Sequence, residues 1–215
     1  MQQSDFAYLS KYPICDTDIW VDVNLVHIEN LLFDKYDKLI FADVVEGEIL
    51  KFSKNSQYNF IANNYLSYRD KGRIIVINHT DFSDELRKLL EKQLFDLSYA
   101  YGFKFSDGLA YIPYEEHKGE IISAMYAKQF NIPFLKSNDG TFKKGNAGQM
   151  AFPTVVVKNR RKTLVDLLEE YDQISTYFQK ICDERECMNE QSRIYSTEPA
   201  SMVEIQSLLN KFRKH

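Results

Sequence analysis

Short apolar runs alternate with helix-like segments over the first three-quarters of the chain. The runs lie at residues 12–15, 39–42, 73–78, 132–136 and 154–157, and those at 73–78 (RIIVIN) and 154–157 (TVVV) are mostly β-branched. Such runs are typical of buried strands. Apolar residues at helical spacing occupy the segments between them, at residues 21–36, 43–52, 58–68 and 119–130. We therefore predict five strands with helices between them.

A further helix is expected after the third strand, with Asp81 or Ser83 as its N-terminal cap. Leucines at positions 86, 89, 90, 94 and 97 recur at helical spacing behind an acidic first turn. Strands separated by helices in this way form βα units around a sheet that is covered on both faces. The predicted fold class is therefore α/β, a three-layer α/β/α domain with a central, mainly parallel sheet.

The pattern changes after residue 158, where only helices are expected. Apolar residues at positions 164, 168, 171, 174, 178 and 181 form one stripe and predict a single long helix. The polar segment 183–199 is predicted to be a loop, and Ser201 with Glu204 forms a capping box that opens a last helix. We therefore predict a domain at residues 1–160 and a C-terminal helical extension at residues 161–215, packed on the domain or continuous with it.

Acidic residues occur where predicted strands end or where helices begin. They are found in the segments CDTDIW, VVEGEIL, GEIISAMYA and SNDG. In a parallel α/β sheet, binding sites form at the carboxyl ends of the strands, so we expect these acids to converge. Two carboxylates about 4 Å apart repel by roughly 4 kcal/mol at an effective dielectric near 20. They therefore need protons or a divalent cation between them.

A cluster of hard oxygen ligands is suited to Mg²⁺ or Mn²⁺ rather than to zinc. Such ions activate water and stabilise the attacking and leaving oxygens of a phosphoryl displacement. The acids therefore predict metal-dependent hydrolysis of a phosphate ester. His117 lies three residues before Glu120, and we interpret it as a polar loop residue rather than a general base.

In their order and spacing these motifs resemble those of the PIN-domain nucleases. The matching elements are D-T-D after the first strand, V-V-x-x-E-I-L in the second helix, G-E-x-x-x-A-x-x-A and S-N-D, within residues 11–158. The resemblance implies a metal-dependent endoribonuclease, in which four acids bind one or two Mg²⁺ or Mn²⁺ ions and a metal-activated water cleaves RNA. The chain departs from compact family members in its longer segment 49–118 and in its last two helices.

The resemblance assigns catalytic and metal-binding roles by position to Asp16, Glu48, Glu120 and Asp139. Asp18 lies beside the first of these acids and is expected to bind metal as well. Glu48 directly precedes the Ile-Leu pair, which favours it as the second acid, and Glu46 is the alternative. Ser137 and Asn138 occupy a turn that in many relatives helps to position metal or phosphate.

The net charge of −4 excludes a protein that coats nucleic acid through bulk positive charge. Contact with an RNA substrate must therefore be local. Basic residues follow the SNDG turn and the last predicted strand, and we expect Lys143, Lys144, Arg160 and Arg161 to contact phosphates.

The three cysteines form no C-x-x-C pair, and their odd number without a secretory context predicts reduced thiols in the cytoplasm. The first residues lack a basic segment followed by an apolar run, and no stretch approaches 18 uninterrupted apolar residues. We therefore expect neither a signal peptide nor a membrane span. The sequence leaves open whether the chain forms a homodimer, has an inhibitory protein partner or acts as a toxin.

Two other functions compete with the nuclease. Domains of this type can survive as catalytically silent nucleic-acid or protein binding modules, although all four key positions here are acidic. A haloacid-dehalogenase-like phosphatase would use Asp16 as its nucleophile, but Trp20 stands where that family's pattern has a small hydroxyl residue or valine. That reading also needs a lysine, for which Lys118 or Lys128 could be nominated.

Overall fold

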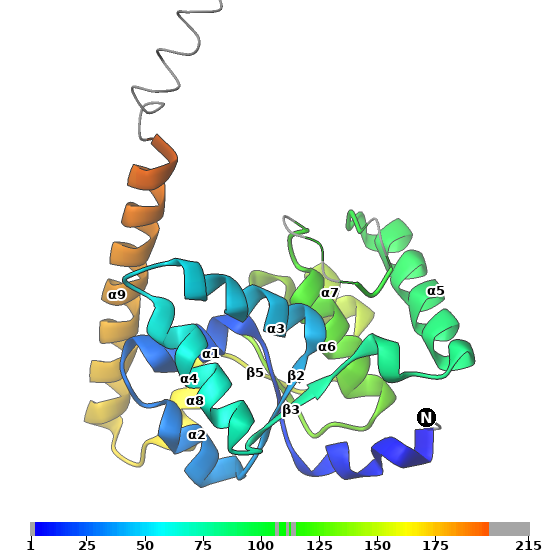
Figure 1. Ribbon diagram of the computed structural model, residues 1–215, viewed down its shortest axis with the longest axis horizontal. Coiled ribbons are helices and arrows are strands. Elements are labelled where there is room, and N and C mark those ends of the chain that lie inside the picture. Colours follow the sequence, from blue (N-terminus) through cyan, green and yellow to red (C-terminus); the bar gives the residue numbers. More distant parts are fainter. Residues whose placement is uncertain (1–2, 106–107, 111, 113–114, 198–215) are drawn as a thin grey trace, which may run out of the picture.

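A five-stranded, all-parallel sheet forms the centre of the molecule in a computed structural model that describes residues 3–105, 108–110, 112 and 115–197 (Figure 1). The strands are β1 (Ile14–Cys15), β2 (Leu39–Ala42), β3 (Ile74–Ile77), β4 (Leu135–Lys136) and β5 (Val157–Lys158). Their order is β3-β2-β1-β4-β5, and every neighbouring pair is parallel. The predicted central sheet is thus confirmed.

Three of the strands are only two residues long, shorter than the runs that predict them. Pro13 and Pro133 have no N–H group to donate to a neighbouring strand, which shortens β1 and β4. β5 begins later than predicted because residues 153–155 form a turn, in which the Val155 N–H donates to the Phe152 carbonyl at 3.1 Å. The apolar runs therefore mark where strands lie but not where they begin.

Helices cover both faces of the sheet (Figure 1). On one side lie α1 (Thr17–Leu25), α2 (Glu29–Tyr36), α4 (Asn59–Asp70) and α8 (Arg160–Leu167). On the other side α6 (Lys118–Gln129) contacts β1, β2 and β4. The remaining α-helices are α3 (Asp43–Leu50), α5 (Asp84–Tyr101), α7 (Ala147–Ala151) and α9 (Tyr171–Thr197). Short 3₁₀ helices lie at Gln3–Lys11, Lys51–Lys54, His79–Asp81 and Gly140–Phe142. The three layers confirm the predicted α/β/α class.

The aromatic core between the sheet and one helical layer is centred on Trp20 of α1. Its ring is fully buried and makes edge contacts with Phe41 of β2 and Tyr65 of α4, each at a centroid distance of 5.8 Å. Its indole N–H donates to the Ile61 carbonyl at 3.1 Å. Because its polar atom is satisfied inside the core, Trp20 fixes α1 on the sheet and so fixes the position of the residues at the start of that helix.

The helix predicted over residues 21–36 is wrong as a single element. The structure has two helices there, and α1 begins earlier because Asp16 caps it. His27 has a φ of 57°, and the Ile28 N–H donates back to the Val23 carbonyl at 2.9 Å. This backbone turn ends α1, so that α2 sets off in a new direction along the sheet.

The C-terminal prediction also needs correction. The stripe at positions 164–181 is divided between α8 and α9, and the predicted loop at residues 183–199 is helical as far as Thr197. Ile181 is fully buried and Met188 packs against the core, so the inward face of α9 continues into the polar segment. The polarity of that segment reflects the exposed face of a helix. The capping box at Ser201 lies outside the described residues.

Figure 1 shows α9 running along one side of the molecule, where it contacts α8 and α1. Within the described part of the chain, none of the helices has the length and apolar character that crossing a membrane requires.

Candidate functional site

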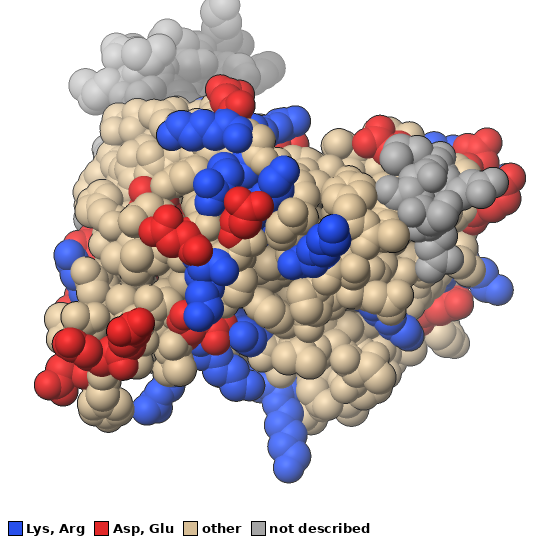
Figure 2. Space-filling view, turned by 90° about the horizontal axis from the view of Figure 1, so that it is seen from below, with Lys and Arg blue, Asp and Glu red and all other residues tan. Residues whose placement is uncertain are grey.

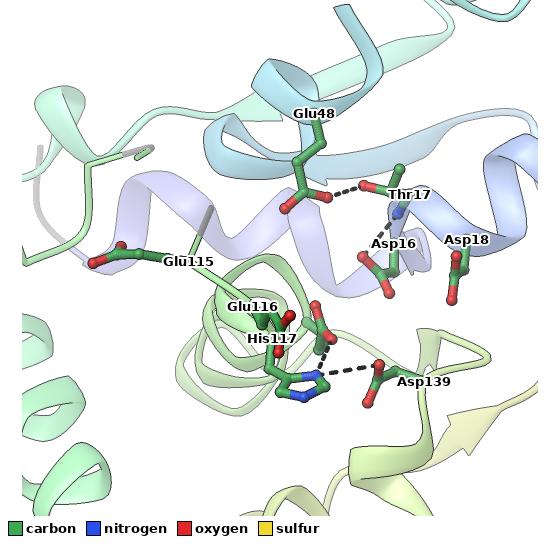
Figure 3. A pocket seen from close by; sticks show the side chains of 9 residues that line it. Asp16, Thr17, Asp18, Glu48, Glu115, Glu116, His117 and Asp139 are labelled. Carbon is green, nitrogen blue, oxygen red and sulfur yellow. Dashed lines mark hydrogen bonds and ion pairs between the residues drawn. The ribbon is translucent and has the colours of Figure 1, made fainter. Parts of the chain in front are cut away.

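An acidic pocket opens at the carboxyl edge of the sheet, where β1 lies between β2 and β4. The chain leaves β1 toward β2 and later returns to its other side as β4, which is the topological position where α/β sheets bind ligands. The pocket has a volume of about 300 Å³. Its lining consists of Asp16, Thr17, Asp18, Glu48, Glu115, Glu116, His117, Glu120 and Asp139 (Figure 3).

Asp16 is held at the end of β1 by two hydrogen bonds. Its Oδ1 accepts from the Thr17 N–H at 2.8 Å, which caps α1, and its Oδ2 accepts from the Ser137 hydroxyl at 2.9 Å. The Ser137 oxygen in turn accepts from the Asp139 N–H at 3.2 Å. Ser137, expected to position metal or phosphate, is itself almost fully buried. It therefore orients a carboxylate and links the ends of β1 and β4.

The side chain of Glu48 reaches the pocket from α3. There its Oε2 accepts a hydrogen bond from the hydroxyl of Thr17, the first residue of α1 (Figure 3). Glu46 instead forms an ion pair with Arg69 and lies outside the pocket lining. A Cβ at Gly119 would lie 3.0 Å from Glu48 Oε1, so a glycine at this position lets α6 pack closely against α3. Of the two glutamates that the sequence offers, Glu48 is the one that faces the other acids.

His117 lies in the turn before α6, in line with its interpretation as a loop residue, and it also lines the pocket. It caps α6 with a φ of 66°, and its Nδ1 lies 3.0 Å from Glu120 Oε1 and 3.3 Å from Asp139 Oδ2 (Figure 3). Thr141 Oγ1 is a third neighbour of this nitrogen at 3.2 Å. The ligand atoms of the histidine and the two acids all lie within 4.8 Å of one another. In the sequence, the three-residue spacing between His117 and Glu120 was the feature that could have predicted that the two side chains lie together.

The carboxyl groups of the pocket perturb one another strongly. Burial raises the pKa of Asp16 well above its ordinary range, and the charges of Asp18 and Glu48 add to the shift. Burial together with the charges of Asp16 and Asp139 raises the pKa of Glu120 to about 11. The pKa values of Asp18 and Glu48 are also raised, chiefly by burial. In the absence of a cation Glu120 therefore retains at neutral pH a proton that an isolated carboxyl would lose.

The pKa of Asp139 is shifted in the opposite direction because its carboxylate accepts hydrogen bonds. Burial acts to raise its pKa, but hydrogen bonds from Thr141 outweigh that effect, and its pKa lies below its ordinary value. The group thus combines Asp139, whose pKa is lowered, with neighbouring acids whose pKa values are raised. A divalent cation would replace the protons, and both the oxygen-rich donor set and the perturbed pKa values fit such an ion.

The remaining predicted substrate contacts lie outside the pocket lining. Lys143, Lys144 and Arg161 are exposed. Arg160 is not free, because its Nε and Nη2 donate to Asp22 at 2.7 and 3.0 Å. Asn138 accepts a hydrogen bond from the Arg160 backbone N–H at 3.3 Å and so ties the turn after β4 to the start of α8.

Three lining residues were not anticipated by the sequence analysis, namely Thr17, Glu115 and Glu116. Thr17 stands between the two aspartates of the D-T-D motif, and this position could have predicted that it lines the same pocket. Glu115 forms an ion pair with the buried ammonium of Lys118, which lies outside the pocket lining. In Figure 3 Glu115 lies to one side of the other acids.

The chain matches no protein-family model, and no curated protein matches its sequence. Among solved structures it is similar to a chain in the crystal structure of VapBC2 from Rickettsia felis bound to a DNA fragment from their promoter. The superposition covers 69% of this chain and 98% of that chain, with 14% sequence identity and a TM-score of 0.43. A TM-score this low does not establish a shared function.

Proposed function

We propose that this protein is a divalent-metal-dependent endoribonuclease that hydrolyses RNA phosphodiester bonds at the acidic pocket. The observation that carries the proposal is the convergence of five carboxyl groups from four segments, those of Asp16, Asp18, Glu48, Glu120 and Asp139, on one pocket at the switch point of a parallel sheet. Such a group is costly to hold together without a cation. The resemblance of the acidic motifs to those of the PIN-domain nucleases supports phosphodiester hydrolysis and RNA as the substrate.

The residues that would hold the metal are Asp16, Asp18, Glu48, Glu120 and Asp139, with His117 as a nitrogen ligand. A bound ion would activate water and neutralise the charge that develops on the phosphodiester. Ser137 and Thr17 keep their carboxylate partners oriented through hydrogen bonds that leave other oxygen lone pairs directed to the pocket. Neighbours of this kind commonly change metal affinity 10- to 100-fold.

The nitrogen of His117 supports Mn²⁺ over Mg²⁺ as the preferred ion. Oxygen ligands suit both ions, but an imidazole nitrogen favours transition metals. In the described structure Nδ1 of His117 is the ring atom that faces Glu120 and Asp139. The proposed ligand set is therefore one histidine with carboxylates, a more selective set than carboxylates alone.

RNA phosphates would be held by exposed cations that follow β4 and β5 in the chain, namely Lys143, Lys144 and Arg161. Arg160 is committed to Asp22, so the proposal does not depend on it. On the face seen in Figure 2, basic and acidic side chains are interspersed. Together with the net charge of −4, the absence of a uniformly basic surface on this face supports local rather than bulk attraction of a polyanion.

The test is cleavage of an end-labelled RNA that contains single-stranded and hairpin segments, with Mn²⁺, Mg²⁺ or EDTA. We expect cleavage with Mn²⁺, weaker cleavage with Mg²⁺, none with EDTA, and loss of most activity in Asp139→Asn. Attack by an external water does not use the ribose 2′-hydroxyl, so the products should lack 2′,3′-cyclic phosphates. Metal-independent cleavage with cyclic ends would indicate a contaminating ribonuclease, and absence of cleavage by a Mn²⁺-loaded protein would contradict the proposal.

The same preparations separate the alternative functions. A phosphatase would form an aspartyl phosphate at Asp16 with a phosphate monoester, whereas a nuclease would not. The phosphatase also lacks its lysine in the lining, because the ammonium of Lys118 is buried in its pair with Glu115. A silent module would bind RNA without turnover in the presence of Mn²⁺.

A further inference from the structure

Two arginines from the C-terminal helices meet one buried aspartate beneath the acidic pocket. The side chain of Asp22 on α1 is only 2% exposed. Arg160 of α8 binds both of its carboxylate oxygens, at 2.7 and 3.0 Å. Arg185 of α9 adds a third contact, from its Nε to Asp22 Oδ1 at 2.7 Å. Arg160 alone therefore forms a bidentate pair with Asp22, and Arg185 is a second cation on the same carboxylate.

The other end of the Arg185 guanidinium extends to the pocket. Its Nη2 donates to the Asp18 backbone carbonyl at 2.7 Å and lies 3.2 Å from Asp18 Oδ1. Asp18 and Asp22 are one turn apart on α1, so a single planar fork can span both. The Asp18 side chain is 40% exposed and lines the pocket, whereas that of Arg185 is 18% exposed.

The charges explain why the second arginine reaches toward the pocket. Asp22 with Arg160 is neutral, and adding Arg185 leaves one positive charge that is largely removed from solvent. Asp18 supplies the matching negative charge, so only the set of four residues is balanced. A buried charge without a partner is costly, and this cost keeps the Asp18 carboxylate directed at Arg185 by one oxygen while the other remains available to the pocket.

We propose that Arg185 is a positioning residue that fixes Asp18 at the edge of the metal site, so that α9 is part of the active centre. This inference rests on the proposed function, because it concerns the same pocket. Arg185 lies in the segment that the sequence predicts to be a loop, 163 residues from Asp22. Its role is to hold one carboxylate in place, and it does not touch the reacting atoms.

The test measures the Mn²⁺ dissociation constant by calorimetry, with folding checked by circular dichroism. Arg185→Gln should weaken Mn²⁺ binding about tenfold, in line with other residues that orient a metal ligand. Arg160→Gln is the matched control, because it breaks the same Asp22 cluster without touching Asp18. It should lower thermal stability yet keep the dissociation constant within about twofold of the wild type.

A double-mutant cycle with Asp18→Asn isolates the contact. In that background Arg185→Gln should change the dissociation constant by less than about twofold, because there is no longer a carboxylate to position. An equal loss of affinity in Arg160→Gln, or a full tenfold loss in the Asp18→Asn background, would assign Arg185 to general packing of α9. Tighter Mn²⁺ binding in Arg185→Gln would mean that its charge only repels the ion and would also overturn the inference.

Arg185→Lys covers the case in which the glutamine variant does not fold. Lysine keeps the charge beside Asp22 but lacks the fork that spans two acceptors, so we expect a folded protein with the same loss of Mn²⁺ affinity. Affinity equal to the wild type in this variant would overturn the positioning role. If the wild-type protein itself bound no Mn²⁺, the proposed function would fail, whereas normal binding in both Arg185 variants would refute only this inference.

Discussion

Glu120→Gln should stabilise the metal-free protein while removing its response to metal. The Glu120 side chain is 11% exposed, and burial with the charges of Asp16 and Asp139 raises its pKa to about 11. At pH 7 the folded metal-free protein therefore keeps this proton, whereas the unfolded chain releases it. The ordinary pKa of 4.5 lies about 2.5 pH units lower, and each unit corresponds to about 1.4 kcal/mol. Retaining the proton thus costs at most about 3 kcal/mol.

Glutamine is neutral at every pH and escapes this cost. For a chain of this size, a gain of that magnitude corresponds to a rise in melting temperature of roughly 6–12 °C. The gain should depend on pH. Because the folded-state pKa is raised, the wild type is most stable below the unfolded pKa and loses stability as pH rises toward the folded pKa of about 11. The difference between Glu120→Gln and the wild type should therefore be small at pH 5.5 and larger at pH 7.5.

The assay is thermal unfolding followed by circular dichroism, in EDTA and in Mn²⁺, at both pH values. The wild type should gain stability on adding Mn²⁺, and Glu120→Gln should gain little. Glu186→Gln is the control, since it removes the same charge from an exposed position on α9. Glu186→Gln should leave both the melting temperature in EDTA and the stabilisation by Mn²⁺ unchanged. A Glu120→Gln protein that is less stable than the wild type in EDTA, or that Mn²⁺ stabilises equally, would refute the reasoning.

Two further substitutions test the ligand set. In His117→Asn the new residue tolerates the positive φ of 66°, so the backbone should keep its conformation. Because an amide replaces the ring nitrogen, the preference for Mn²⁺ over Mg²⁺ in competition calorimetry should fall about tenfold. An unchanged preference would mean that His117 is not a ligand. Gly119→Ala would place a methyl group 3.0 Å from Glu48 Oε1 and should weaken Mn²⁺ binding in a folded protein. Gly140→Ala, which has no heavy atom within 4 Å of the added Cβ, should bind Mn²⁺ normally, and equal losses in both variants would count against a role for Glu48.

The layered fold could be predicted because it depends on local signals. The β-branched run at residues 73–78 is apolar because β3 lies in a sheet with helices on its faces, and the acids of CDTDIW follow β1 directly. Strand lengths could not be predicted in the same way. They depend on which backbone groups find a partner strand, and a proline or a turn removes that partner, as at Pro13 and after Phe152.

The choice between Glu46 and Glu48 shows what the sequence leaves undecided. Two residues apart on a helix lie on different faces, so only one can point to the pocket, and the sequence does not specify the rotation of α3. That rotation is set by packing, including the close approach of α6 at Gly119. The motif resemblance favoured Glu48, and the geometry places Glu48 beside Thr17.

Polar contacts between residues far apart in the sequence could not be predicted, for a different reason. Arg185 and Asp18 are separated by 167 residues, and nothing in the polar segment around Arg185 distinguishes it from an exposed arginine. Its burial depends on the tertiary position of α9, which was itself obscured because the segment is hydrophilic on its outer face. Functional side chains contributed by such a helix have no local signature.

The protons of the metal-free pocket and the proposed metal ion compete for the same oxygens. Asp16 and Glu120 have raised pKa values because neighbouring carboxylates are brought close in a buried site. The surrounding donors do not neutralise these acids, since Ser137 and Thr17 are uncharged. The cations near the pocket act from its margins: Arg185 pairs with Asp18, and the charge of Lys51 lowers the pKa of Glu48, but neither cation is in the pocket lining. The fold therefore brings together more carboxyl groups than the neighbouring cations can balance, and the remainder must be balanced by protons or by an entering cation, as the proposed metal site requires.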